Sequence, residues 1–407
     1  MKLLDGKLPL LLDGATGTNL FAAGMPAGVC PEQWILEHPQ VIQKLQQSYA
    51  DAGSDIIYAP TFGANRVALS HFGLEDKVAE MNRELIKITR AAVGHRVLVA
   101  GDMSSTALQA EPFGETSFEE MIDIYREQAS ALKAAGADLL VCETLMSLTD
   151  ARAAVLAANE CKMPVFVTIT VNQNGRTISG SSLLQCVLTL QAMGAAAVGL
   201  NCSTGPEDMA EFIRPVMPYA KVPIIAKPNG GRMIDGVLQN VVTPEEFAQG
   251  IKMLLDAGAR IVGGCCGTTA SHIAQVRWML KEYYPEPLPE VEDVIAACYE
   301  NSVFFLGDTL DLSDPLTCTS DLADEFIELE DAGCNAVLVE INDVNDAQEL
   351  GMNAYMSHLP IAVRAYTYEG LEEALRLYQG RLIIDSQGDV SEQDVKNLAA
   401  KYGAIVL

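Results

Sequence analysis

Three cysteines in this sequence stand where they could bind one metal ion. Cys265 and Cys266 are neighbours in the stretch Gly264–Thr268 and follow an apolar run, and Cys202 ends a second apolar run that begins at Ala197. Adjacent side chains of a strand point to opposite faces, so two neighbouring thiols serve one site only where the backbone turns sharply. The glycines on either side of the cysteine pair permit such a turn. We therefore predict that the three thiolates hold a zinc ion whose fourth position is left for a substrate.

This set of ligands favours one kind of reaction. Closed structural zinc sites usually have four ligands, often in C-x2-C pairs, and no fourth cysteine with suitable spacing is present. Three thiolates make a divalent zinc ion poorly suited to activating water. Such an ion suits a substrate thiol, because binding lowers the thiol pKa from about 8.5 and delivers a thiolate at neutral pH. The pattern predicts a zinc-activated transfer of an alkyl group to a thiol.

The elements that must position these thiols alternate between short apolar strands and longer amphipathic helices. Eight strand–helix units in about 280 residues are typical of a (β/α)8 barrel, or TIM barrel, whose functional residues gather at the C-terminal ends of the strands. Cys202 ends the sixth expected strand and Cys265 the eighth. A doubly wound sheet is the alternative, but its G-x-G-x-x-G fingerprint is absent. The expected strands are 10–13, 55–60, 97–102, 139–143, 164–171, 197–202, 223–228 and 261–265.

A proline-rich segment interrupts this alternation. Prolines at alternate positions in residues 284–292 favour an extended linker. We expect the barrel to occupy residues 1–283. Residues 293–407 should form a smaller α/β domain, either part of a barrel or an open parallel sheet. The strands expected there are 303–307, 336–341, 361–365, 382–386 and 404–407.

The charge and cysteine content limit the possible partners and compartment. With 27 basic and 54 acidic residues, the net charge is −27. An acidic surface repels phosphate backbones and anionic membranes, so we expect no nucleic-acid or membrane partner. No secretion signal or apolar run of membrane-spanning length is visible. We expect a reducing cytoplasm, where clustered cysteines indicate metal binding or catalysis more than disulfides, although a Cys265–Cys266 disulfide is the alternative.

Several motifs accompany the cysteines within residues 10 to about 283. They are Asp13–Ala15, Thr61–Arg66, Gly73–Lys77, Glu143–Thr144, Gly199–Ser203, Gly205–Pro206, Pro228–Gly231 and Gly263–Thr268. With these motifs the sequence resembles the homocysteine S-methyltransferase family, and within it the homocysteine-binding module of cobalamin-dependent methionine synthase. The stretch Thr61–Arg66 favours the methionine synthase branch.

The resemblance assigns roles to individual residues. It implies that Cys202, Cys265 and Cys266 are zinc ligands and that homocysteine is methylated to methionine. Asp13 and Glu143 are expected near the amino group of homocysteine. The backbone of Gly14, Ala15 and Thr16 is expected to receive its carboxylate. Asn229 matches a position beside the zinc. No role is assigned to the tip of the third strand, residues 101–106.

The methyl donor is left open by the sequence. No cobalamin-binding D-x-H-x-x-G motif occurs, so the donor must come from outside this chain. A methyl-corrinoid (methylcobalamin) on a separate protein is preferred. The alternatives are S-methylmethionine, S-adenosylmethionine or a betaine-type donor, or a non-catalytic scaffold subunit of a methyltransferase system. Residues 375–407 weakly resemble part of a pterin-binding barrel, but the expected pterin signatures are altered, so folate binding is not expected.

Four of the polar residues also have purely structural explanations. Asp13 could belong to an Asp-Gly turn or cap a helix, and Asn229 could belong to a Pro-Asn-Gly-Gly turn. Glu143 could be a paired acid that ends a strand. His272, in the first turn after the cysteine pair, is expected to be structural or to support the site from outside it.

Overall fold

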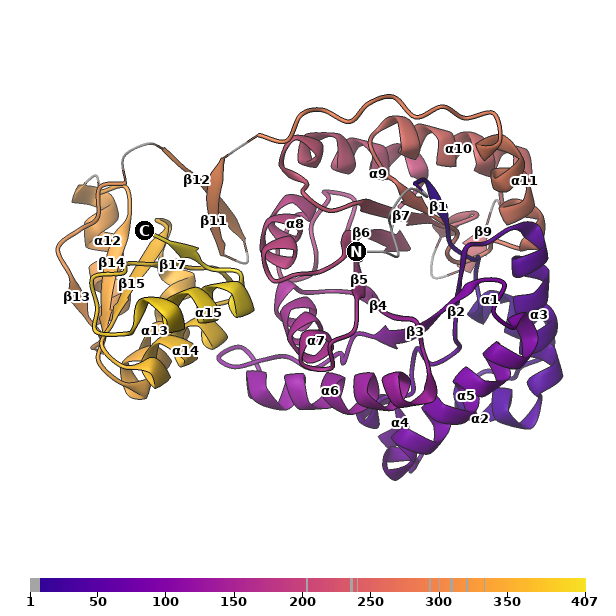
Figure 1. Ribbon diagram of the computed structural model, residues 1–407, viewed down its shortest axis with the longest axis horizontal. Helices are drawn as coiled ribbons and strands as arrows, with labels where there is room; N and C mark the ends of the chain where they lie inside the picture. The colour runs from indigo at the N-terminus through magenta and orange to yellow at the C-terminus, as the bar shows by residue number, and fades with distance from the viewer. Residues whose placement is uncertain are drawn as a thin grey trace.

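The computed structural model describes residues 8–202, 204–234, 237–239, 241–292, 294–299, 301–307, 310–319, 321–332 and 334–407. Its larger part is a barrel of eight parallel strands in the order β1-β10-β7-β6-β5-β4-β3-β2, which confirms the expected fold class (Figure 1). The strands are β1 (Leu10–Leu11), β2 (Ile56–Tyr58), β3 (Leu98–Ser104), β4 (Leu139–Leu145), β5 (Val165–Ile169), β6 (Ala197–Cys202), β7 (Ile224–Pro228) and β10 (Ile261–Val262).

The edge strands β1 and β2 are joined through Asp55, the residue before β2. Its N–H donates to the carbonyl of Leu11 over 2.6 Å, and its carboxylate accepts the N–H of Leu11 over 2.8 Å. Arg277 pairs with the same carboxylate over 2.6 Å. These contacts bring the two edges together, so the C-terminal ends of all eight strands surround one mouth.

Helices surround the barrel and bury its outer face. Interior side chains such as Leu12, Tyr58, Val141 and Phe166 form a separate core inside the strands. The helices are α1 (Gly17–Ala22), α2 (Pro31–Glu37), α3 (Pro39–Ala52), α4 (Arg66–Ser70), α5 (Val78–Val93), α6 (Phe118–Ala135), α7 (Leu148–Glu160), α8 (Leu183–Ala192), α9 (Pro206–Ile213), α10 (Pro244–Asp256) and α11 (Ala270–Leu280), with 3-10 turns at Glu75–Lys77 and Arg214–Tyr219. In the described part of the chain, every helix is too short or too polar to cross a bilayer.

Two features of this barrel differ from the expectation. In the expected strand 261–265, only Ile261–Val262 pairs with neighbouring strands. The residues after Val262 leave the sheet to form the turn that carries the cysteine pair. A hairpin of β8 (Arg232–Ile234) and β9 (Val237–Gln239), which the sequence analysis did not anticipate, follows β7.

The smaller part contains a five-stranded parallel sheet in the sequential order β13-β14-β15-β17-β18, as in a segment of a barrel (Figure 1). The expected strand 303–307 is not in this sheet. It is β12, which pairs antiparallel with β11. The elements are β11 (Ile295–Tyr299), β12 (Ser302–Leu306), β13 (Leu316–Thr317), α12 (Leu322–Ala332), β14 (Val337–Ile341), α13 (Val344–Asn353), a 3-10 turn at Ala354–Met356, β15 (Ile361–Ala365), α14 (Tyr368–Leu377), β16 (Gly380–Arg381), β17 (Ile383–Ile384), α15 (Glu392–Tyr402) and β18 (Ile405–Val406).

Arg152 of α7 links the two parts. Its side chain is fully buried and donates to Gln379 over 2.8 Å and to the carbonyl of Leu375 over 2.8 Å. It also contacts the carbonyl of Arg376 over 3.3 Å and lies 5.1 Å from the ring centre of Phe118. These carbonyls belong to the last turn of α14, where a cation is favourable.

Replacing Arg152 by alanine should therefore loosen the contact between the two parts. The change leaves buried carbonyls without donors and should cost about 2–4 kcal/mol. Differential scanning calorimetry should show a lower Tm or two resolved transitions. Arg126→Ala is the matched control, because Arg126 makes partly exposed ion pairs on the neighbouring helix, and these contribute little. Equal effects of the two changes would contradict this account.

Candidate metal and substrate site

The three cysteines predicted as metal ligands meet at the mouth of the barrel. Their sulfur atoms all lie within 4.8 Å of one another, and each thiol is partly exposed. A tetrahedral ion with Zn–S bonds of about 2.3 Å would hold its sulfurs about 3.8 Å apart, so the cluster is compact enough for one ion. All ten cysteines of the chain are free thiols in the structure, so Cys265 and Cys266 are not joined by a disulfide.

The end of β7 fixes the relative position of the thiols. Cys202 is the register partner of Pro228 in the β6–β7 ladder, and the N–H of Cys265 donates to the carbonyl of Pro228 over 2.9 Å. The carbonyl of Cys266 accepts the N–H of Gly230 over 2.8 Å. One strand end therefore positions all three ligands through its backbone.

The turn after β10 is closed by Thr268. Its hydroxyl donates to the carbonyl of Cys265 over 2.8 Å and accepts the N–H of Ala15 over 3.0 Å. A Cβ on Gly264 would lie 2.4 Å from this hydroxyl, so only glycine fits there. The predicted carboxylate-binding backbone, Gly14 to Thr16, is thus held against the cysteine turn. Within it, the N–H of Ala15 is already used by Thr268.

Cys202 has a left-handed backbone conformation, with φ of +65°, and so does Thr144 at the tip of β4, with φ of +63°. This conformation costs a non-glycine residue roughly 1–2 kcal/mol. Asn201 supports both tips, because its side chain accepts the N–H of Thr144 over 2.9 Å and donates to the Thr144 hydroxyl over 2.8 Å. At these two positions the strained backbone lies at the mouth, beside the cysteine cluster.

A group of buried charged residues, the ionic chamber, lies beside the thiols. It consists of Asp13, Asp102, Glu143 and Lys227, together with Tyr58. The ammonium of Lys227 donates to Glu143 over 2.9 Å and lies 3.8 Å from the ring centre of Tyr58. Asp13 accepts the N–H of Tyr58 over 2.8 Å. One oxygen each of Asp13, Asp102 and Tyr58 is buried without a hydrogen-bond partner.

Burial governs the protonation of the three acids in the ionic chamber. It raises the pKa of Asp13 to about 7, although the charge of Lys227 opposes this shift. Burial also raises the pKa of Asp102, and Glu143 adds to the effect. The pKa of Glu143 is raised by burial too, against the attraction of Lys227. Burial disfavours the charge of Lys227, yet Glu143 and its neighbours raise the pKa of Lys227 well above its usual value.

Contacts among the three cysteine thiols also shift their pKa values. Hydrogen bonds with Cys202 and Cys265 lower the pKa of Cys266 to about 3, whereas hydrogen bonds with Cys265 and Cys266 raise the pKa of Cys202. Three touching thiols therefore favour a single thiolate. Because a bound cation would favour ionisation of all three, the donor set fits a metal ion.

The structure brings most of the sequence-predicted residues together. Asn229 follows β7, and its Oδ1 is buried without a partner. His272 caps α11 through Thr269 and contacts the carbonyl of Val242 over 3.0 Å, which agrees with the structural role expected for it.

Lys227, Asp102 and Tyr58 were given no role in the sequence analysis. A signal for two of them exists, because Lys227 and Asp102 are the charged residues in otherwise apolar strands.

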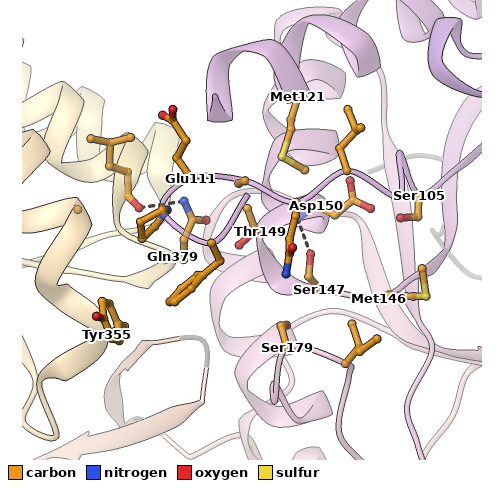
Figure 2. Close-up of a pocket in the computed structure, with 18 of the residues that line it drawn as sticks. Ser105, Glu111, Met121, Met146, Ser147, Thr149, Asp150, Ser179, Tyr355 and Gln379 are labelled. Atoms are coloured by element: carbon orange, nitrogen blue, oxygen red, sulfur yellow. Dashed lines mark hydrogen bonds between the residues drawn. The ribbon is translucent and has the colours of Figure 1, made fainter. Parts of the chain in front are cut away.

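A separate cavity of about 520 Å³ lies where the barrel meets the smaller part. Figure 2 shows Ser105, Met146 and Ser179 from the loops of the barrel on one side and Tyr355 and Gln379 on the other. None of the sequence-predicted site residues lines this cavity. The predicted site residues therefore lie apart from this cavity.

Asp13→Asn should make stability less dependent on pH. The folded protein holds the Asp13 proton more tightly than the unfolded chain, whose pKa is 3.8. The resulting stabilisation is complete below about pH 4 and is lost as pH rises through 7, by up to roughly 4 kcal/mol. In metal-free protein, Tm of the variant minus Tm of the unchanged protein should thus increase between pH 5 and pH 8. Asp51→Asn, at an exposed position, is the control. A constant difference across this range would contradict the assignment.

Comparisons with known proteins agree with this geometry. A family model described as homocysteine S-methyltransferase matches residues 10–280. The chain is 27% identical over 450 residues to methionine synthase from Mycobacterium leprae (strain TN), covering 97% of this chain and 37% of the relative. It is 30% identical over 285 residues to methionine synthase from Mycobacterium tuberculosis (strain ATCC 25618 / H37Rv), covering 65% and 24%. The chain thus spans about a third and a quarter of these two proteins.

Among solved structures, the metallated form of the homocysteine methyltransferase MmuM from Escherichia coli matches with a TM-score of 0.58 and 25% identity, covering 68% of this chain and 98% of that one. The apo form of the same protein matches with a TM-score of 0.55 and 25% identity, covering 68% and 97%. The family match extends over all eight barrel strands and includes the three converging thiols. The chain belongs to the homocysteine S-methyltransferase family.

Proposed function

We propose that this protein catalyses zinc-dependent methyl transfer to the thiol of homocysteine, producing methionine. The observation that carries the proposal is the compact cluster of Cys202, Cys265 and Cys266 beside the ionic chamber at one barrel mouth. The cluster offers three sulfur donors, and the described residues contribute no fourth His, Cys, Asp or Glu to it. This leaves a position for the thiol of a substrate.

The three cysteines would hold the zinc ion in a prearranged turn. When bound, zinc would lower the pKa of the substrate thiol, so that the attacking sulfur is a thiolate at neutral pH. The backbone bonds to Pro228, Gly230 and Thr268 hold the ligands in place before any substrate arrives. Asn229 lies next to the turn, with its Oδ1 free of protein partners.

The ionic chamber would hold the amino-acid end of homocysteine. Asp13 and Glu143 supply acceptors for the α-ammonium group, and Lys227 keeps Glu143 in place through a buried ion pair. The carboxylate would lie toward the backbone of Gly14 to Thr16. With both ends of the substrate held, the sulfur attacks the methyl carbon in line, and the bond to the donor breaks with its electron pair leaving on the donor.

A methyl-corrinoid on a separate protein is the preferred donor. Three exposed apolar side chains, Phe62, Met146 and Ile178, follow β2, β4 and β5 and so lie on the rim that a donor must approach. Exposed apolar groups on a functional rim support docking of another protein. The much longer methionine synthases among the relatives also favour this branch. Reduced thiols are essential to the chemistry, so we place the reaction in a reducing cytoplasm.

A small sulfonium is the second candidate donor. The match to MmuM covers nearly all of that protein, so the matched part of this chain corresponds to a whole homocysteine methyltransferase of known structure. A betaine-type donor and a non-catalytic scaffold are further alternatives. The proposal assigns the reaction to residues 1–283 and gives residues 293–407, beyond the 284–292 linker, no folate-binding role.

Cys266→Ala should abolish tight zinc binding. The unchanged protein should retain about one zinc ion per chain after dialysis against a weak chelator, whereas the variant keeps only two of the three thiolates and should lose most of it. Inductively coupled plasma mass spectrometry measures the metal content. Cys318→Ala, a partly exposed cysteine of the smaller part, should retain zinc. A zinc content unaffected by Cys266→Ala would refute the assignment.

Donor assays should separate the two candidate donors. The zinc-loaded protein is given homocysteine with methylcobalamin or with S-methylmethionine, and methionine is measured by mass spectrometry. We expect methionine from methylcobalamin and little or none from the sulfonium. Efficient turnover with S-methylmethionine alone would replace the corrinoid proposal with the second candidate. The absence of methionine from every donor, together with normal zinc binding, would favour the scaffold.

A further inference from the structure

Asp102 is the residue in the ionic chamber whose role is least explained by the fold. It lies on β3, where alternation places it on the interior face two positions after Ala100, a residue of the interior core. Its register partner on β4 is Val141, another interior residue, and Glu143 follows two positions later on the same face. Asp102 and Glu143 therefore both face the barrel interior from neighbouring strands.

The backbone of Asp102 is held in place, but one oxygen of its carboxyl group has no hydrogen-bond partner. Its main chain is anchored on both sides by Thr61, whose hydroxyl accepts the N–H of Asp102 over 2.9 Å and donates to its carbonyl over 2.8 Å. The residue is only 6% exposed, and its Oδ1 is buried without a partner. A buried carboxyl oxygen without a donor is destabilising, which is expected where a ligand supplies the missing donor.

The balance of charges indicates what that ligand carries. Three acids, Asp13, Asp102 and Glu143, share the chamber with Lys227, the basic side chain that acts on all of them among the described residues. Lys227 already donates to Glu143 over 2.9 Å. Free acceptor oxygens remain on Asp13 and Asp102, so the chamber lacks a cation with several N–H donors. A primary ammonium has three such donors.

We propose that Asp102 is a specificity-determining residue that accepts a hydrogen bond from the α-ammonium group of the amino-acid substrate. This inference rests on the proposed function. It adds a third carboxyl group to the ammonium subsite and gives Lys227 the task of holding Glu143 rather than contacting the substrate carboxylate. Asp102 thereby makes the site select an α-amino thiol over a thiol that lacks the amino group.

Calorimetric titration of zinc-loaded protein with two ligands tests this role. L-Homocysteine and 4-mercaptobutanoate share the thiol, chain length and carboxylate, but only homocysteine has the ammonium group. Asp102→Asn should weaken homocysteine binding roughly 10- to 100-fold, since a charge-assisted hydrogen bond is lost. Binding of 4-mercaptobutanoate should change less than about twofold, because that ligand never contacts Asp102.

Two further measurements separate this role from a structural one. Because Oδ1 of Asp102 is buried without a partner, Asp102→Asn should have a Tm equal to or above that of the unchanged protein. Asp150→Asn is the matched control, since the Oδ1 of this buried aspartate already accepts hydrogen bonds from Tyr125 and Thr106. That control should not alter the ratio of the two affinities.

The outcomes are distinguishable. Equal losses for both ligands, an unchanged homocysteine affinity, or a marked fall in Tm of Asp102→Asn would overturn the role of Asp102 and leave the proposed function intact. A zinc-loaded, unchanged protein that binds neither thiol would overturn the proposed function and this inference with it.

Discussion

The carboxyl end of β7 is the constraint on which the site depends. Pro228 is in register with Cys202 on one side, and its carbonyl accepts the N–H of Cys265 on the other. The N–H of Gly230, two residues later, donates a hydrogen bond to the carbonyl of Cys266. Since these contacts use backbone atoms, they survive side-chain variation on β7. They also require β6, β7 and β10 to be adjacent, which is the order that a parallel barrel produces.

The ionic chamber shows how stability and function oppose each other in this mouth. Three carboxyl groups and one ammonium group are buried within the mouth, and burial of charge is unfavourable unless each charge has a partner. The Lys227–Glu143 pair satisfies part of this requirement. The remaining acceptors on Asp13 and Asp102 are unsatisfied in the protein alone, and this is the observation behind the proposed ammonium subsite. The strained backbone of Cys202 and Thr144 is a second local cost at the same mouth.

The smaller part is attached firmly without entering the mouth. Arg152 crosses from α7 to the end of α14, and a continuous apolar core contains side chains of both parts. The parallel sheet of the smaller part has five strands in sequential order, with the β11–β12 hairpin packed on one face. Loops of the barrel rim and of the smaller part together line the cavity in Figure 2.

The sequence by itself determined the alternation of strands and helices, the barrel and the three thiols at the strand ends, because apolar periodicity and glycine-framed cysteines are local signals. It also indicated Glu143, Asp13 and Asn229 through motifs. It did not reveal Asp102 or Lys227, because each is a single charged residue in an apolar strand and gains its meaning only from neighbours on other strands. The antiparallel pairing of 303–307 was missed for a similar reason, since strand direction depends on a distant partner. Tertiary structure decided these points because burial, charge pairing and unsatisfied acceptors are properties of side chains that meet across the barrel.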